Sequence, residues 1–171
     1  NGRDDLAIGV PFENGYGAVH VFYSDNTGLN PGFREHYFAQ VSLGDGDLPG
    51  TAEAGDLFGF SLAVGDFDAN GYDDLAIGVP GEDTETVVAE DGGAVNVVYG
   101  SATGLDATLH PQIFDQSNPA AVPGTAEDGD RFGFALAAGD FDGNGYDDLA
   151  VGAPFEVYNG NAAAGHVSLL F

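Results

Sequence analysis

The sequence GDFDANGYDDLAIGVP occupies residues 65–80 and returns at residues 139–154 as GDFDGNGYDDLAVGAP. Its second half, NGRDDLAIGVP, occupies residues 1–11. The matched asparagines Asn1, Asn70 and Asn144 therefore recur with a period of about 70 residues. This period is too long for helical-hairpin or leucine-rich repeats and suits a unit of about four short strands, as in a propeller blade. The repeat predicts one supersecondary unit, built several times, that carries an oxygen-rich loop.

The composition favours a folded protein that attracts cations. The chain has 28 acidic and 3 basic residues, with a formal net charge of −25, so nucleic acids and anionic membrane surfaces should be repelled. Hydrophobic residues make up 43% and aromatic residues 12%, which is enough for a packed core. Because cysteine is absent, cross-bracing must come from packing or from oxygen-ligated ions.

Short apolar runs predict an all-β fold of four-stranded antiparallel blades. The first strand is predicted in residues 58–67 and 132–141, and the second in residues 75–80 and 149–154, where proline ends the run. A third strand is predicted at residues 17–23, 93–99 and 165–171, and a weaker fourth strand around Phe38 and Phe114. Long helical periodicity is absent. These runs amount to about two and a half blades.

The strand count predicts a division of one propeller domain into three parts. Residues 1–49 are interpreted as strands two to four of a partial blade, residues 50–123 as a complete blade, and residues 124–171 as strands one to three of a further blade. So few blades leave open faces at both ends. We therefore expect either the remaining blades of a longer chain or self-association.

The loop that follows each first strand predicts a calcium site. In the central copy, side-chain oxygens occur at loop positions 1, 3, 5 and 9, glycine at position 6 allows a sharp turn, and the carbonyl at position 7 can point inward. Hard cations such as Ca²⁺ prefer this oxygen-only arrangement. The predicted ligands are Asp66, Asp68, Asn70, Tyr72 (by its backbone carbonyl) and Asp74, and in the second complete copy Asp140, Asp142, Asn144, Tyr146 (by its backbone carbonyl) and Asp148. About two Ca²⁺ sites are expected.

Two other interpretations of this loop are weaker. An EF-hand begins in the same way but needs Glu at position 12, where Ile77 and Val151 stand, and it needs flanking helices. A simple polar turn does not need three aligned carboxylates, whose mutual repulsion costs stability without a cation.

The first copy of the loop is incomplete. Asn1 and Asp5 match positions 5 and 9, and the backbone carbonyl of Arg3 matches position 7, but nothing in the sequence matches positions 1 and 3. This partial site is expected to bind Ca²⁺ weakly or not at all.

The repeat resembles a known family. Phe58-Gly59, the DFDANGYDD loop and Gly78-Val79-Pro80, repeated at residues 132–133, 140–148 and 152–154, resemble the FG-GAP repeat of integrin α-subunit β-propellers and their bacterial or archaeal relatives. The resemblance implies a seven-bladed propeller, calcium in the loop between the first and second strands, and ligand recognition on the opposite face.

From these patterns we expect a calcium-binding segment of a secreted or cell-surface protein that serves adhesion or ligand binding. The partner would be a protein or a glycan. No catalytic residues are predicted, because there is no nucleophile elbow and the acidic pair Asp73-Asp74 recurs as a repeated structural part. The alternative is a propeller part of an extracellular hydrolase acting on carbohydrate or lipid. No membrane-spanning run is present.

Overall fold

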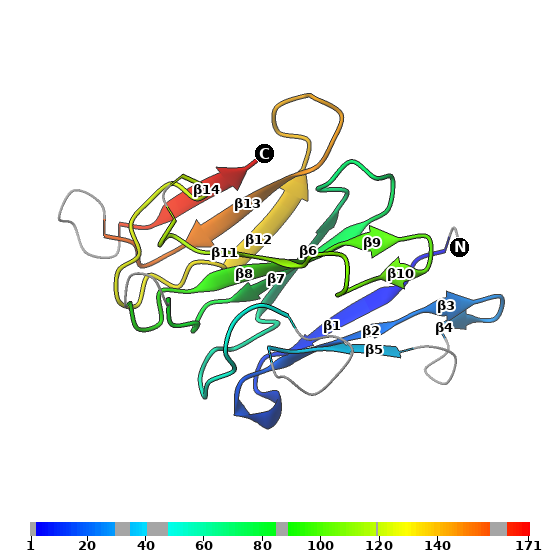
Figure 1. Ribbon diagram of the computed structural model, residues 1–171, viewed down its shortest axis with the longest axis horizontal. Coiled ribbons are helices and arrows are strands. Elements are labelled where there is room, and N and C mark those ends of the chain that lie inside the picture. Colours follow the sequence, from blue (N-terminus) through cyan, green and yellow to red (C-terminus); the bar gives the residue numbers. More distant parts are fainter. Residues whose placement is uncertain (1–2, 30–34, 41–47, 85–88, 119, 158–163) are drawn as a thin grey trace.

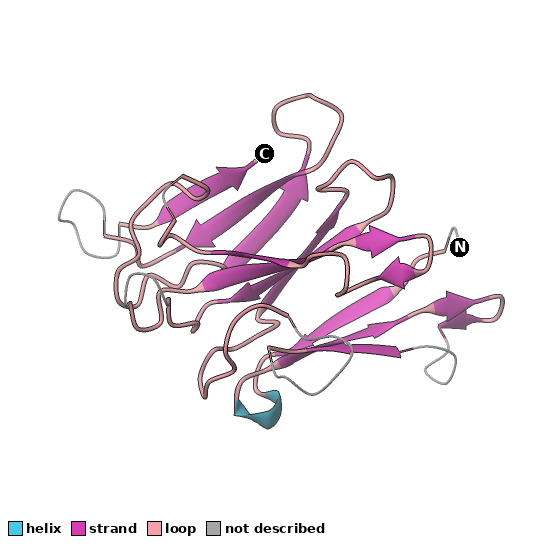
Figure 2. Ribbon diagram, viewed as in Figure 1, coloured by secondary structure: helices cyan, strands magenta, loops and turns pink. Residues whose placement is uncertain are grey.

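The computed structural model describes residues 3–29, 35–40, 48–84, 89–118, 120–157 and 164–171. Within these residues the fold is all-β, as predicted. Three antiparallel sheets lie side by side like the blades of a fan (Figure 1), in the arrangement of a partial β-propeller. Figure 2 shows the helical part that accompanies them, a single 3-10 turn at Glu13–Gly15.

Each sheet is built from strands in a simple up-and-down order. The first contains β1 (Leu6–Val10), β2 (Ala18–Phe22) and β5 (Glu35–Phe38). The central sheet contains β6 (Ser61–Gly65), β7 (Asp74–Val79), β8 (Ala94–Val98) and β11 (Gln112–Phe114). The third contains β12 (Ala135–Gly139), β13 (Asp148–Ala153) and β14 (His166–Leu170). The regions predicted as second, third and fourth strands thus contain strands in the structure.

Two details differ from the prediction. The first strand of the central sheet begins at Ser61 rather than at Phe58, because the preceding residues form a turn in which the Phe60 N–H bonds the Leu57 carbonyl at 3.0 Å. The structure also contains two small ladders outside the predicted strands. These are β3 (Ser24–Asp25) with β4 (Gly28–Leu29), and β9 (Gly100–Ser101) with β10 (Gly104–Leu105).

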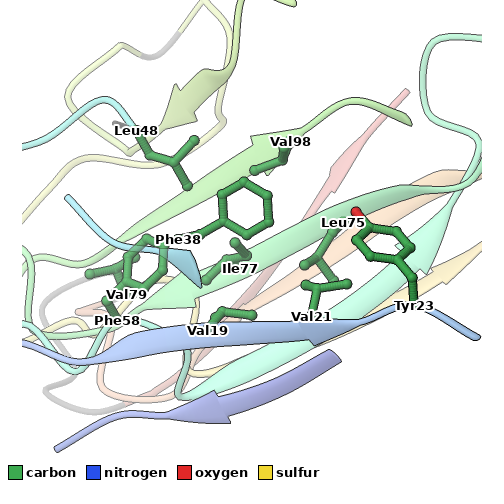
Figure 3. Packing of buried hydrophobic residues seen from close by; sticks show 10 residues of the cluster. All are labelled: Val19, Val21, Tyr23, Phe38, Leu48, Phe58, Leu75, Ile77, Val79 and Val98. Carbon is green, nitrogen blue, oxygen red and sulfur yellow. The ribbon is translucent and has the colours of Figure 1, made fainter. Parts of the chain in front are cut away.

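The hydrophobic core lies between the sheets rather than inside any one of them. Val19 and Val21 of the first sheet pack with Leu75, Ile77 and other side chains of the central sheet (Figure 3). A second cluster, which includes Val95 and Val151, joins the central sheet to the third. The central sheet is consequently covered on both faces, and every residue of β7 and β8 is buried.

The phenylalanine of each Phe-Gly pair fastens one sheet to the sheet before it. Phe58 and Phe132 are fully buried, and their backbone N–H groups donate to the carbonyls of Tyr16 and Gly92 at 2.8 and 2.9 Å. The backbones approach so closely that a Cβ on Gly93, whose φ is +87°, would lie 2.2 Å from the Phe132 carbonyl oxygen. The Phe-Gly motif is therefore an inter-sheet joint. The predicted division at residues 49 and 123 stays a prediction.

Candidate metal centres

The loop between β6 and β7 gathers three of the predicted calcium ligands. Carboxylate oxygens of Asp66, Asp68 and Asp74 all lie within 4.8 Å of one another. Asp66 directly follows β6 and Asp74 begins β7, so the antiparallel pairing of Gly65 with Asp74 brings the two ends of the loop together. The sheet itself therefore fixes the first and last acids of the triad.

Backbone hydrogen bonds hold these carboxylates in place. Asp66 accepts the N–H groups of Asn70 and Gly71 at 3.0 and 2.9 Å. Asp74 accepts the N–H of Phe67 at 2.8 Å and, with its other oxygen, the N–H of Gly100 at 2.7 Å. Each oxygen retains a lone pair after one such bond, so the same groups can also bind a cation.

The environment of Asp74 raises its pKa. Burial is the main cause, and the negative charges of Asp68 and Asp66 act in the same direction, while the N–H groups of Gly100 and Phe67 oppose it. In the part of the chain that the structure describes, no salt bridge from Arg or His reaches these three carboxylates. Among the described residues, no ion pair therefore offsets their mutual repulsion.

The carboxylate oxygens of the triad are close enough to share one calcium ion. Oxygens on opposite sides of a Ca²⁺ ion stand about 4.6–5.2 Å apart, because each Ca–O distance is about 2.3–2.6 Å. Three carboxylates no farther apart than 4.8 Å can therefore share one Ca²⁺ ion, and their donor type is the one that it prefers.

The loop between β12 and β13 repeats the arrangement. Carboxylate oxygens of Asp140, Asp142 and Asp148 again lie within 4.8 Å of one another. Asp140 accepts the N–H groups of Gly143 and Gly145 at 2.7 and 3.0 Å. Both loops leave the same edge of the fan in Figure 1. The structure thus brings together the aspartates predicted for each complete copy.

Ion binding stays a prediction for all of these residues, the asparagines and tyrosines included. The amide oxygens of Asn70 and Asn144 accept the N–H groups of Tyr72 and Tyr146, each at 2.8 Å. These bonds place the asparagine side chains within their loops.

The partial first site keeps one structural feature of the complete ones. Asp5 accepts the N–H of Ser24 at 2.8 Å, just as Asp74 accepts the N–H of Gly100. Arg3 is exposed, and Asn1 lies outside the described residues. Weak or absent binding at this site remains a prediction.

The structure also contains an acidic group that the sequence analysis missed. Carboxylate oxygens of Glu127, Asp130 and Glu156 lie within 4.8 Å of one another, beyond the opposite end of β13 from Asp148. A signal was present in the sequence, because GTAEAGD at residues 50–56 recurs as GTAEDGD at residues 124–130. Glu156 belongs to a different segment from Glu127 and Asp130, so only the fold reveals that the three meet.

Comparisons with known proteins agree with the repeat pattern. The FG-GAP repeat family profile matches residues 58–98 and 132–170. A phosphatidylinositol-glycan-specific phospholipase D of Rattus norvegicus is 31% identical over 166 residues, covering 91% of this chain and 17% of the relative. Integrin alpha-PS5 of Drosophila melanogaster is 39% identical over 161 residues, covering 90% of this chain and 14% of the relative. The chain thus spans less than a fifth of the length of these relatives.

One further observation concerns membranes. Among the described residues, no helix is long and apolar enough to cross a bilayer.

Proposed function

Because the chain belongs to the FG-GAP repeat family, we propose that it is a calcium-binding β-propeller segment of a secreted or cell-surface protein. Its role is adhesion or the binding of a protein or glycan ligand. The metal ions are structural, and the segment has no chemistry of its own.

The observation that carries this proposal is the pair of aspartate triads at equivalent loops of neighbouring sheets. Each triad concentrates three carboxylates in a chain whose formal charge is already −25. A divalent cation at each loop would offset the repulsion and fix the first hairpin of its sheet. Stability should therefore depend on calcium.

The proposed structural role follows from the form of the loop. A catalytic metal keeps a position open for substrate or water, whereas these loops can surround the ion with side-chain and backbone oxygens. The same arrangement also occurs in two successive repeats, while an active site is ordinarily built once. These features support a segment that is not an enzyme.

The proposed location agrees with the calcium affinity that we expect for these loops. Calcium loops of extracellular modules bind in the range of about 10⁻⁴–10⁻³ M, which suits an environment where Ca²⁺ is about millimolar. Similarity to a protein named integrin alpha-PS5 points in the same direction. Recognition is proposed for the end of the sheets opposite the metal loops, where the connections after Pro80 and Pro154 differ in sequence and length.

The third sheet presents a surface for a further repeat. Phe58 packs beside Gly17 and Phe132 beside Gly93, and the next glycine of this series, Gly165, lines a hollow of about 340 Å³ together with Phe134. We propose that the hollow receives the phenylalanine of a further FG-GAP repeat, from the same protein or from a second copy. The mass in solution, measured by light scattering, separates these two sources.

Thermal melting with and without Ca²⁺ tests the metal assignment. Wild-type protein should gain on the order of 5 °C at saturating Ca²⁺, since a ligand at 100 times its Kd contributes about 2.7 kcal/mol. Asp68→Ala and Asp142→Ala should each lose part of that gain. Asp73→Ala is the matched control, because Asp73 lies in the same loop but outside the triad. An unchanged gain in both triad variants would remove the assignment.

A second candidate function is supported by one comparison. The similarity to phosphatidylinositol-glycan-specific phospholipase D covers 91% of the chain. The segment would then be a propeller part of an extracellular hydrolase that acts on lipid or carbohydrate. The reading frame on both sides discriminates the two functions: a catalytic domain supports the hydrolase, and a cell-wall or membrane anchor supports adhesion.

A further inference from the structure

We propose that Gln116, Glu127, Asp130 and Glu156 form a divalent-cation site of a second kind, located at the junction between the central and third sheets. The site is distinct from the loop triads and takes a hard cation such as Ca²⁺. We call these four residues the junction cluster. Its existence does not depend on the adhesion or hydrolase role proposed above.

The junction cluster is assembled from three separate segments. Gln116 follows β11 of the central sheet, Glu127 and Asp130 precede β12, and Glu156 follows β13. The three carboxylates lie within 4.8 Å of one another, the same spread as in the loop triads. The Gln116 side chain reaches Glu156, since its Nε2 donates to Glu156 Oε2 at 2.6 Å. A bound ion would therefore tie neighbouring sheets together.

Oxygen atoms without hydrogen-bond partners are the independent sign of a ligand. Gln116 is 2% exposed and Asp130 is 0% exposed. Gln116 Oε1, Glu127 Oε2 and Asp130 Oδ1 are buried and have no hydrogen-bond partner, and in the described part of the chain only Gln40 Oε1 shares this condition. Each such oxygen costs about 1–3 kcal/mol if it stays unsatisfied. All three are acceptors, and those of Glu127 and Asp130 belong to carboxylates of the cluster, where one cation could satisfy both.

A backbone hydrogen bond to Asp130 leaves one of its carboxylate oxygens available to a cation. Asp130 Oδ2 accepts the N–H of Glu127 at 2.7 Å, which fixes the carboxylate and leaves Oδ1 without a partner. Gln116 is fixed as well, because a Cβ on Gly124 would lie 2.3 Å from its Nε2. The amide therefore packs against a residue that must have no side chain. Both ligand groups are held in place before any ion binds.

The charge at the junction cluster is not balanced by an ion pair. The ion pairs found in the described residues join His20 to Glu13 and Glu35, and Arg131 to Asp91. Burial raises the pKa of Glu156, and the nearby charge of His166 only partly opposes this rise. Burial and the neighbouring Asp130 and Glu156 also raise the pKa of Glu127 to about 7.

The junction between the first and central sheets provides an internal comparison. Gln40, Asp56 and Glu82 occupy the positions that correspond to Gln116, Asp130 and Glu156, and Gln40 Nε2 donates to Glu82 Oε2 at 2.7 Å. Here, however, Glu53 is exposed, and its carboxylate does not join those of Asp56 and Glu82 in a comparable group among the described residues. Gln40 also contacts the Asn96 amide oxygen at 3.4 Å. The cation site is therefore proposed for the second junction alone.

Calorimetric titration of the whole chain with CaCl₂ at pH 7.5 tests the proposal. Wild type should bind one ion more than Glu127→Gln or Glu156→Gln, or those variants should bind it at least tenfold more weakly. Glu53→Gln, the matched substitution at the first junction, should bind as wild type does. Neutralising a buried carboxylate relieves repulsion, so the variants should fold. An unchanged stoichiometry and affinity in both junction variants would overturn the proposal.

Two further measurements separate the possible causes of failure. In Asp68→Ala/Asp142→Ala the junction site should remain, so complete loss of Ca²⁺ binding there would refute the junction site while supporting the loop sites. Anomalous scattering from Ca²⁺-soaked crystals should give a peak between Gln116, Asp130 and Glu156. Well-ordered side chains without a peak would show that the carboxylates share protons instead.

Discussion

The backbone N–H of Asp66 donates to the carboxylate of Asp147 at 3.1 Å, and the N–H of Asp147 donates to the Asp66 carbonyl at 3.3 Å. Asp66 belongs to the metal loop of the central sheet and Asp147 to that of the third sheet. The two acids of the Asp147-Asp148 pair thus have separate tasks, since Asp148 joins its own triad while Asp147 reaches the neighbouring loop. The two candidate calcium loops are directly connected.

Replacement of Asp147 by Ala should weaken both loops together. The variant removes the acceptor for the Asp66 N–H and should lower the free energy of unfolding in Ca²⁺ by about 1–3 kcal/mol. Urea denaturation in saturating Ca²⁺ measures this, with Asp73→Ala as the matched change in the central loop. Equal losses in the two variants would show that the contact between loops adds nothing.

Replacement of Gly93 by Ala should disrupt the joint between the central and third sheets. The new Cβ would meet the Phe132 carbonyl oxygen at 2.2 Å, so backbone must move, and we expect a loss of more than about 2 kcal/mol. Gly129→Ala is the control, because its φ of +80° is equally unfavourable but no atom lies within 4 Å of the new Cβ. The prediction is wrong if denaturant unfolding gives the two variants the same stability.

Glu82 should make the protein less stable as the pH rises. Burial raises the pKa of its carboxyl to about 8, and the charges of Asp56 and Glu53 add to the effect. The folded state keeps a proton that the unfolded chain releases near its ordinary pKa of about 4.5, so the stability is complete below that pH and is lost as the pH rises through about 8.

The Glu82→Gln variant should escape this loss. Its stability should match that of wild type near pH 4 and exceed it by on the order of a few kcal/mol near pH 9, since the new amide can bond both atoms of the Gln40 amide. Urea unfolding at both pH values provides the measurement. Parallel pH profiles for variant and wild type would contradict the raised pKa.

Magnesium should stabilise the protein much less than calcium. Mg²⁺ requires a nearly ideal octahedron with short metal–oxygen distances and gives up its water reluctantly, whereas a loop of side-chain and backbone oxygens suits the larger Ca²⁺ ion. Melting curves at equal concentrations of the two chlorides compare them. Equal shifts would indicate general charge screening rather than a fitted site.

The sequence was sufficient to predict the strands and the loop triads because both depend on local patterns. Asp66 and Asp74 are brought together by a hairpin whose two strands are adjacent in the chain. The junction cluster was not predicted, because Gln116, Asp130 and Glu156 meet only after sheets have packed face to face. Small ladders such as β9 with β10 were also missed, since two residues per strand give no periodicity to recognise.

The pentapeptide LAIGV separates what the sequence determines from what the tertiary structure determines. It occurs at β1 (Leu6–Val10) and again within β7, and in both places the sequence alone dictates a strand that follows an acidic loop. Leu6 and Ile8 are each 41% exposed, whereas Leu75 and Ile77 are 1% and 0% exposed. Identical side chains meet different surroundings because the central sheet has a neighbour on each face. The local sequence determines where strands and turns form. The burial of a strand's side chains depends on which sheet packs against it.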